Sequence, residues 1–317
     1  MVRYAARRGI QMIPVVFFVA IMVFVVIHTL PGDPILALIG HDATGVDPEA
    51  MAKMRHDLGL DDPIYVQFGR WFFNLLRGDL GTSTRLHMPV TELIASRAPV
   101  TVHLALSAWL IGIGIGVPAG IIAAVKRNSA ADMLATVAAM VGIAVPSFWL
   151  GILAIWLFAV VLKWLPTAGF VGLLDDPVQS ARFLILPATT LGLHLTASIM
   201  RQTRSALLEV LGSDYVRTAR AKGLADLNVV GLHALKNALL PVVTVMGLQL
   251  GRLLGGTVIT ETLFAVPGLG RTAVQSILTR DYMALQGVVL VMAMVVLVVN
   301  LLTDLLYARL DPRISYR

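Results

Sequence analysis

The sequence predicts an all-α integral membrane protein with six transmembrane helices, and its composition and its hydropathy pattern are the grounds for this. Of its 317 residues, 57% are hydrophobic and only 14% are charged, and the mean hydropathy is +0.81. An average soluble domain carries about 25% charged residues. A soluble core of this size cannot bury so much apolar surface, so lipid is the expected solvent.

Six runs of the sequence are long enough to cross the hydrocarbon of a bilayer, which takes about 20 apolar residues. They are solid rather than alternating, and backbone groups in lipid must be satisfied internally, so each run is expected to be a helix. The first is longer than the apolar region of a signal peptide and has no A-x-A-like cleavage site, so we expect it to be retained. The runs cover residues 9–32, 98–125, 133–162, 183–200, 237–260 and 282–303, with only Arg252 interrupting the fifth.

Lysine and arginine gather in alternate connections between these runs. The tail 1–8, the turn 126–127, the segment 201–236 and the tail 304–317 are basic, whereas residues 31–97 hold nine acids against six bases. Basic connections stay on the cytoplasmic side of a membrane. Six spans and this charge bias agree, and both place the two termini in the cytoplasm.

These assignments divide the chain into three parts. Residues 1–32 are the N-terminal tail and the first span, residues 33–97 form an extracytoplasmic loop, and residues 98–317 hold the other five spans. Asp47-Pro48 and Asp62-Pro63 each match a capping residue followed by proline at a helix start, so two short helices are expected in the loop. The second has an aromatic face that packs on the membrane or the protein's own spans, or meets an extracytoplasmic partner. That face consists of Tyr65, Phe68, Trp71, Phe72 and Leu75.

Two spans carry glycines at every fourth residue, and a third contains a proline. Such glycine spacing lets helices approach closely, either as tight packing or as an interface that slides. Pro146 is expected to kink or divide the third span, because proline removes a backbone donor. The glycines are Gly112, Gly116 and Gly120, then Gly247, Gly251 and Gly255.

The cytoplasmic segment 201–240 is long enough to hold structure of its own. Asp214 is expected to cap a short helix that Gly223 stops, and Asp226 to start a second helix that leads into the fifth span. The short helix has little apolar surface to bury. The pattern predicts a protruding knob that is suited to a groove in another protein.

Here the sequence resembles the permeases of ABC importers, in the branch that carries dipeptides, oligopeptides and nickel. The stretches 214–223 (DYVRTARAKG) and 233–241 (HALKNALLP) resemble the cytoplasmic coupling loop of that branch. The resemblance extends over nearly the whole chain. Further matching stretches are LPGDP at 30–34, LGLD at 58–61, GDLG at 78–81, FAVPGLG at 264–270, RDY at 280–282, DLLY at 304–307 and DPR at 311–313.

The resemblance implies the type I importer permease fold, in which spans two to six form a core and span one is added. It implies a bacterial plasma membrane location and three kinds of partner: a second homologous permease, two ATPase subunits and an extracytoplasmic substrate-binding protein. A coupling helix would sit in a groove of the ATPase. The matching positions are Tyr215, Arg217, Thr218, Ala219, Arg220, Ala221, Lys222 and Gly223.

The sequence departs from the general importer motif, which begins Glu-Ala-Ala, at Arg217-Thr218-Ala219. The peptide branch shares this departure. Arg217 would pair either with an acid of the ATPase or with Asp214. Peptides are the expected substrates, with nickel chelates or glutathione as alternatives within the same importer class.

No enzymatic activity and no cofactor are expected of the chain itself. It has no phosphate-binding loop of the G-x-x-x-x-G-K-[ST] type, so ATP and magnesium would bind to the partner subunits. An ion-coupled carrier needs an acid within its spans, and Glu261 and Asp304 are expected only at span ends. A membrane enzyme needs a cluster of reactive groups. There is no cysteine, and the span histidines lack metal-ligand spacing, so no catalytic or metal site is expected.

Arg252 stands out because an intramembrane charge is costly and usually faces protein or water. Gln249 lies one turn earlier on the same face, so both are candidates for the translocation pathway, where Arg252 would attract a substrate carboxylate. Alternatively, Arg252 extends to the outer interface or pairs with Glu261. Weaker pathway candidates are His103, His194 and Asn300.

Overall fold

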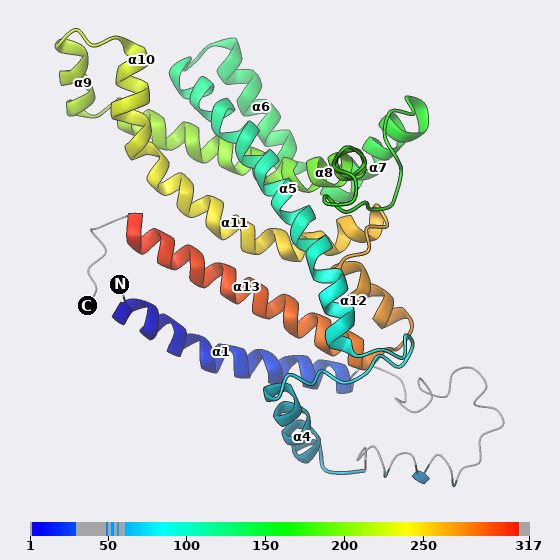
Figure 1. Cartoon of the computed structure of the whole chain (residues 1–317). Coiled ribbons are helices and arrows are strands. Elements are labelled where there is room, and N and C mark those ends of the chain that lie inside the picture. Colours follow the sequence, from blue (N-terminus) through cyan, green and yellow to red (C-terminus); the bar gives the residue numbers. More distant parts are fainter. Residues whose placement is uncertain (1, 30–48, 50–51, 54–55, 57–60, 311–317) are drawn as a thin grey trace.

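The computed structural model describes residues 2–29, 49, 52–53, 56 and 61–310 as a bundle of helices without a β-sheet. The expected helix that begins at Asp47-Pro48 falls largely outside these residues. Figure 1 shows the order of the elements. The helices are α1 (Val2–Thr29), α4 (Ile64–Leu76), α5 (Val90–Val125), α6 (Ala130–Ala144), α7 (Ser147–Ala154), α8 (Pro177–Leu211), α9 (Asp214–Ala221), α10 (Asp226–Asn228), α11 (Leu235–Leu263), α12 (Leu269–Leu278) and α13 (Tyr282–Leu310).

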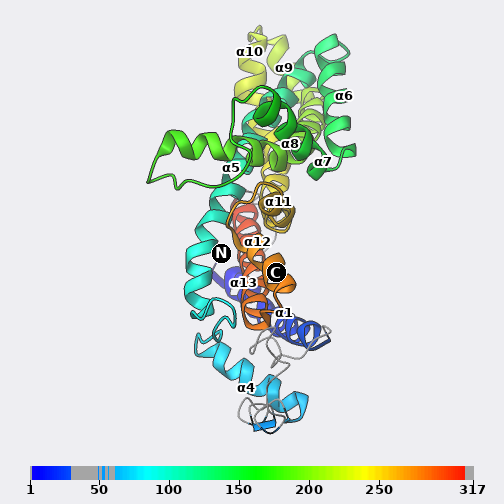
Figure 2. The same ribbon diagram turned by 90° about the vertical axis from the view of Figure 1, so that its right-hand side faces the viewer.

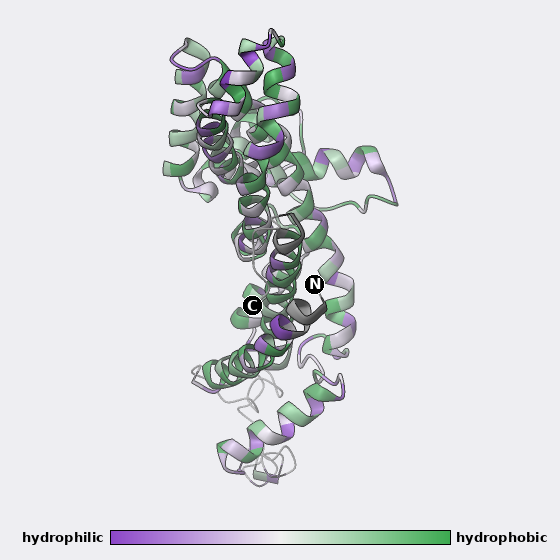
Figure 3. Cartoon of the chain, turned by 90° about the vertical axis from the view of Figure 1, so that its left-hand side faces the viewer, coloured by the Kyte–Doolittle hydropathy of each residue, from purple (hydrophilic) through white to green (hydrophobic). Residues whose placement is uncertain are grey.

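Five helices of the described chain are long and apolar enough to cross a membrane, namely α1, α5, α8, α11 and α13. The long helices are largely hydrophobic in Figure 3, whereas α4 shows both hydrophobic and hydrophilic residues along its length. A sixth span is obtained when α6 is joined to α7 and the π-helical turn η2 (Ile155–Val161) that follows it. The predicted number of spans is therefore reached only with this bent pair.

The prediction that Pro146 divides the third span is confirmed. Helix α6 ends at Ala144, Val145 is extended, and α7 begins at Ser147. The two halves are bent by 103° at this break. Proline has no N–H to offer to the helix and disfavours helical backbone at the residue before it, which explains why the break falls at Val145.

Helix α8 packs against α5 through the glycines of α5. A Cβ atom on Gly116 would lie 2.8 Å from the carbonyl oxygen of Thr196, and one on Gly120 would lie 2.7 Å from that of Met200. Gly112 likewise faces Leu195. Tight packing therefore accounts for this glycine row without any sliding of the helices.

The second glycine row is less uniform. Gly247 and Gly251 of α11 face Thr303 and Asn300 of α13, whereas a Cβ atom on Gly255 would meet nothing within 4 Å. Only Gly247 and Gly251 of this row therefore serve close packing between α11 and α13. Around α5, α8 and α11 lies the largest apolar core, which includes Leu104, Leu195, Ile199, Leu207, Val242 and Met246.

The first span lies beside the last one and is covered by α4. Arg8 of α1 pairs with Asp304 of α13 at 3.1 Å, so the start of α1 and the end of α13 lie at the same end of the bundle. The aromatic face of α4 packs on α1: the ring centroids of Phe72 and Phe17 are 5.3 Å apart, and those of Phe68 and Phe24 are also 5.3 Å apart. The face is thus used at least for packing on the protein's own span.

Two helix starts differ by one residue from the predictions. Pro63, rather than Asp62, occupies the N-cap position of α4, and Asp62 instead pairs with Arg70 at 2.7 Å. Ser213, rather than Asp214, occupies the N-cap position of α9. Asp62 precedes the N-cap residue of α4 by one position, and Asp214 follows the N-cap residue of α9 by one position. Neither acid therefore occupies the position from which it was expected to cap its helix.

At the end of the bundle away from Arg8 and Asp304, two buried carboxylates join neighbouring helices and the segments between them. Glu261 accepts a hydrogen bond from the Thr101 hydroxyl at 2.7 Å and one from the Arg271 N–H at 2.9 Å, which ties α11 to α5 and α12. Asp281 accepts bonds from the Ser83 hydroxyl and from the N–H of Ala284 at the start of α13. Glu261 does lie near the end of a span as predicted, but it is fully buried within the protein.

We predict that Gly116→Leu prevents α5 and α8 from packing, because a side chain there would displace the backbone of α8. The protein should be recovered in low yield and aggregated on size-exclusion chromatography in detergent. Gly114→Leu is the matched control, since a Cβ atom on Gly114 meets nothing within 4 Å. Equal recovery of both variants would contradict the role of this contact.

Candidate functional site

The segment between α8 and α11 forms a short hairpin of helices at one extreme of the molecule (Figure 2). Helix α9 ends where the N–H of Gly223 bonds to the carbonyl of Arg220 at 2.9 Å, and Gly223 has a φ of +81°. This left-handed conformation is easily adopted only by glycine, so the predicted stop at Gly223 is confirmed. Helix α10 begins at Asp226, also as predicted, and passes through the π-helical turn η3 (Val229–Ala234) into α11.

Helix α9 is fixed to the bundle by its inner face. Val216 is 0% exposed and belongs to the same apolar core as Val229 and Ala234 of η3. The hydroxyl of Tyr215 accepts a hydrogen bond from the Asn237 side chain at 2.9 Å and donates one to the His233 carbonyl at 3.4 Å. These contacts join α9 to the start of α11.

The outer face of α9 is charged and exposed. Arg217 pairs with Asp214 at 3.4 Å, the second of the two pairings expected for it, and Arg220 pairs with Asp226 at 3.1 Å. The side chains of Arg217 and Asp214 are 78% and 94% exposed. Exposed ion pairs contribute little stability and exchange readily. These charges are therefore available to a partner surface.

The residues predicted to form the coupling helix are divided between the inner and the outer face of α9. Arg217, Thr218 and Lys222 are exposed, whereas Ala219 is half-buried against the core. The sequence reasoning missed Val216, which is the anchor of the helix. The sequence did indicate a buried side of this helix, because Val216 and Ala219 are three residues apart and therefore lie on one apolar side of a short helix.

A cavity of about 430 Å³ lies between the Pro146 break, α8 and α11. His194 of α8 and Gln249 and Arg252 of α11 line it together with the residues of the break. Three of the five pathway candidates are thus brought to one place. The break belongs there physically, because non-helical backbone at membrane depth is tolerated where it is buried in protein or lines a water-filled cavity.

The other two pathway candidates lie elsewhere. His103 is half-buried on α5 with its ring edge-on to Phe170, at 5.9 Å between centroids. Asn300 of α13 packs against Gly251, with its side-chain oxygen 2.8 Å from the place of a Cβ atom there. Neither lines the cavity. His103 and Asn300 therefore stay pathway candidates that lie outside this cavity.

The environment of Arg252 excludes one of the alternatives. Glu261, its expected partner, is fully buried and bonded to Thr101 and Arg271. Arg252 is exposed and makes no ion pair within the described part of the chain. Its charge therefore faces the cavity without a counter-ion from the residues placed in the structure.

A second cavity, of about 460 Å³, adjoins the first along α8. Ile143 lines both, and the Gln249 amide at the first donates a hydrogen bond to Ser198 at the second, at 3.0 Å. Ser198, Arg201 and Ser205 continue from His194 at intervals of four, three and four residues, which places them on one face of α8. Sequence reasoning did not single out this polar face, because Arg201 marked the end of a charge-free run.

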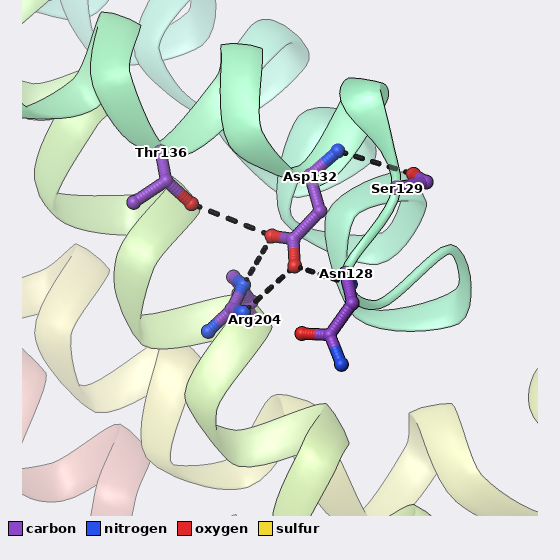
Figure 4. A network of polar contacts seen from close by, with 5 residues as sticks. All are labelled: Asn128, Ser129, Asp132, Thr136 and Arg204. Carbon is purple, nitrogen blue, oxygen red and sulfur yellow. Dashed lines mark hydrogen bonds and ion pairs between the residues drawn. The ribbon is translucent and has the colours of Figure 1, made fainter.

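An ion pair at the edge of the second cavity fixes α6 to α8 (Figure 4). The Arg204 guanidinium donates two hydrogen bonds to the Asp132 carboxylate, at 2.6 and 2.9 Å. The N–H of Asn128 and the hydroxyl of Thr136 also donate to Asp132, at 2.9 and 3.4 Å. Asp132 is only 4% exposed, whereas the Arg204 side chain is 29% exposed, and the bidentate geometry orients the two side chains toward each other.

These features define a multi-pass membrane protein with a polar, cavity-lined face and an exposed, anchored helix at one end. Comparison with known proteins specifies the class. Residues 116–316 match the family described as binding-protein-dependent transport system inner membrane component, and residues 1–105 match the N-terminal region described for membrane components of such systems. The chain therefore belongs to this family, the permease subunits of ABC transporters.

Individual relatives of the chain support its membership of this family. The chain is 46% identical over 310 residues, with 98% of each chain covered, to a permease protein of Brucella suis biovar 1 assigned to a peptide transport system. It is 43% identical over 317 residues, with 100% of each covered, to a glutathione transport system permease of Salmonella paratyphi A. A solved structure of the MetNI methionine ABC transporter in an inward-facing conformation has the same fold, with a TM-score of 0.58, 19% identity, and 69% of this chain and 96% of that chain covered.

We predict that Asp132→Asn lowers the unfolding temperature of the purified protein by several degrees, because Arg204 loses its counter-ion and its bidentate contact with the buried side chain. Exchanging the two charges, in Asp132→Arg with Arg204→Asp, should recover part of the loss. Arg127→Gln is the control, since Arg127 is exposed in the neighbouring turn and has no ion pair among the described residues. A thermal shift for Arg127→Gln as large as that for Asp132→Asn would contradict a specific role for the pair.

Proposed function

We propose that this chain is the permease subunit of an ATP-driven, binding-protein-dependent importer of di- and oligopeptides, with α9 as its coupling helix. The observation that carries the proposal is the construction of α9, which is anchored by Val216 and Tyr215 and presents exposed charges outwards. The anchor holds α9 on the bundle while its charged side chains stay open to a partner surface. Under this proposal α9 and both termini lie in the cytoplasm.

The energy for transport comes from other subunits. The sequence contains no phosphate-binding loop, so ATP and magnesium bind to two ATPase partners, and α9 sits in a groove of one of them. A second homologous permease completes the pathway, and an extracytoplasmic binding protein delivers the substrate. Membership of the binding-protein-dependent family supports these partners.

The position of α9 indicates how its movement reaches the pathway. It follows directly on α8 through Gly212 and Ser213, and its Tyr215 hydroxyl is bonded to His233 in η3 and to Asn237 at the start of α11. Helices α8 and α11 are the ones that contribute His194, Gln249 and Arg252 to the cavity. A displacement of α9 therefore acts on both polar walls at once.

Peptides are the proposed substrates because the relatives assigned to transport systems for peptides and for glutathione are 43–46% identical over nearly the full length. The experiment is reconstitution of the whole complex in proteoliposomes with uptake of radiolabelled dialanine, in competition with unlabelled glutathione or a nickel chelate. ATP-dependent uptake that only peptides suppress supports the proposal. Uptake by this chain alone, without ATPase subunits, would overturn it in favour of an ion-coupled carrier.

We predict that Gly223→Val uncouples the complex, because a β-branched residue strains the left-handed stop of α9. Transport and substrate-stimulated ATPase activity should fall on the order of tenfold while the subunit still inserts and assembles. Gly223→Asn is the matched control, because asparagine adopts this conformation more readily than other residues with a side chain. Normal coupling in Gly223→Val would remove α9 from the mechanism.

We predict that Tyr215→Phe lowers the amount of peptide transported per ATP hydrolysed without preventing assembly. The change removes only the hydroxyl that joins α9 to Asn237 and His233. Asn237→Ala should have a similar effect, and the double variant should be no worse than either single one, since both break the same link. Additive losses in the double variant would show that the two residues act separately.

A further inference from the structure

We propose that the cavity at the Pro146 break contains a binding subsite for the carboxylate of the transported molecule, with Arg252 as the cation that recognises it. The inference rests on the proposed function and specifies the chemistry of its pathway. It names the substrate class as molecules with a free carboxylate, which dipeptides, longer peptides and glutathione share.

The electrostatic character of the cavity carries the inference. Its lining includes Arg252, His194 and Gln249, and none of the described lining residues is an aspartate or a glutamate. An uncompensated cation within a membrane segment is costly unless it faces water or a group of opposite charge. The cavity therefore favours a negatively charged group over a positively charged one.

Two buried acids on the helices that border the cavity, Glu261 and Asp132, are bound to donors of their own. Glu261, on the same helix, accepts hydrogen bonds from Thr101 and from the Arg271 backbone. Asp132, on the helix that leads to the break, is held by both nitrogens of the Arg204 fork. Because each of these carboxylates has its own donors, Arg252 lines the cavity without an ion pair to either of them.

Two further polar side chains, Gln249 and His194, line the cavity together with Arg252. Gln249 donates one N–H to Ser198 at 3.0 Å, which fixes its amide and leaves the carbonyl and the second N–H for another partner. His194 is exposed in the same lining and makes no hydrogen bond to any residue that the structure places. A charged Arg252 with two polar neighbours matches the pattern of a small-molecule site, in which few polar groups orient a ligand among apolar walls.

The size of the cavity is compatible with such a ligand. Its volume of about 430 Å³ falls in the range of roughly 300–1,000 Å³ that is typical of small-molecule sites. Leu191, Leu195 and Leu253 provide apolar wall, and Val145 and Pro146 provide the broken backbone. A zwitterionic dipeptide would place its carboxylate at Arg252 and its side chains against the leucines.

The absence of cysteine from the chain permits a direct test. Arg252→Cys is placed in the complete complex in proteoliposomes and treated with methanethiosulfonate reagents that attach an aminoethyl, a sulfonatoethyl or a methyl group. Uptake of dialanine should fall by about tenfold in the untreated variant, since one charge-assisted contact is lost. The aminoethyl group should restore it, and the other two groups should not.

Controls separate charge from volume and from folding. Arg252→Lys should retain most of the uptake, and dialanine supplied during ATP turnover should slow the modification of the cysteine. Leu302→Cys on α13, which is exposed but does not line the cavity, should transport normally before and after treatment. A variant that is modified and rescued only by a positive group has been shown to be folded.

The outcomes distinguish this inference from the proposed function. If the wild-type complex takes up dialanine with ATP and Arg252→Cys transports equally well, the subsite is overturned while the importer remains. The same holds if the methyl group restores uptake as fully as the aminoethyl group, or if the cysteine cannot be modified. If the wild-type complex takes up no dialanine, the peptide proposal and the subsite fail together.

Discussion

The close approach of α5 and α8 is the contact on which the rest of the structure depends. Glycines at 112, 116 and 120 bring the backbone of α8 within contact distance of α5, and the apolar core forms around this crossing. Because one face of α8 is fixed in this way, another face, from His194 to Ser205, is left to line the two cavities. The same helix runs directly into α9. The contact with α5, the polar wall of the two cavities and the connection to α9 are therefore all part of one helix.

The break at Pro146 directs α7 toward α11, while both halves of the third span also pack on α8. Helix α6 is fixed to α8 by the Asp132–Arg204 pair, while α7 packs at Gly151 against Leu263 near the far end of α11. A continuous helix would have satisfied its own backbone and presented a closed wall. The broken helix instead leaves non-helical backbone at Val145 and Pro146, and this backbone lines the cavity together with Arg252. The division of the span and the cavity thus occur at the same place in the structure.

The two ends of the described bundle are stabilised by different physical means. At the end near α12, Glu261 and Asp281 are buried and fully engaged with hydroxyl and backbone donors, which fixes α12 and the start of α13. At the end with α9, only Val216 is fully buried in that helix, and its charged side chains are exposed. Buried, saturated carboxylates resist movement, whereas weak exposed ion pairs can be exchanged for those of a partner. This contrast suits the coupling role that we propose for α9.

The sequence by itself determined the class of fold, the spans, the division at Pro146 and the stop at Gly223, because hydropathy, proline and glycine act through the local backbone and the bilayer. It also indicated that Gln249 and Arg252 share a helix face. Only the tertiary structure decided that His194 joins them while His103 and Asn300 do not, that Val216 anchors α9, and that Asp132 belongs to Arg204. These relations join residues of different helices, or depend on what a helix packs against. The local sequence does not determine how helices that are distant in the chain are rotated relative to one another. Their rotation depends on the glycine contacts and on the ion pair between helices, and these form only when the bundle assembles.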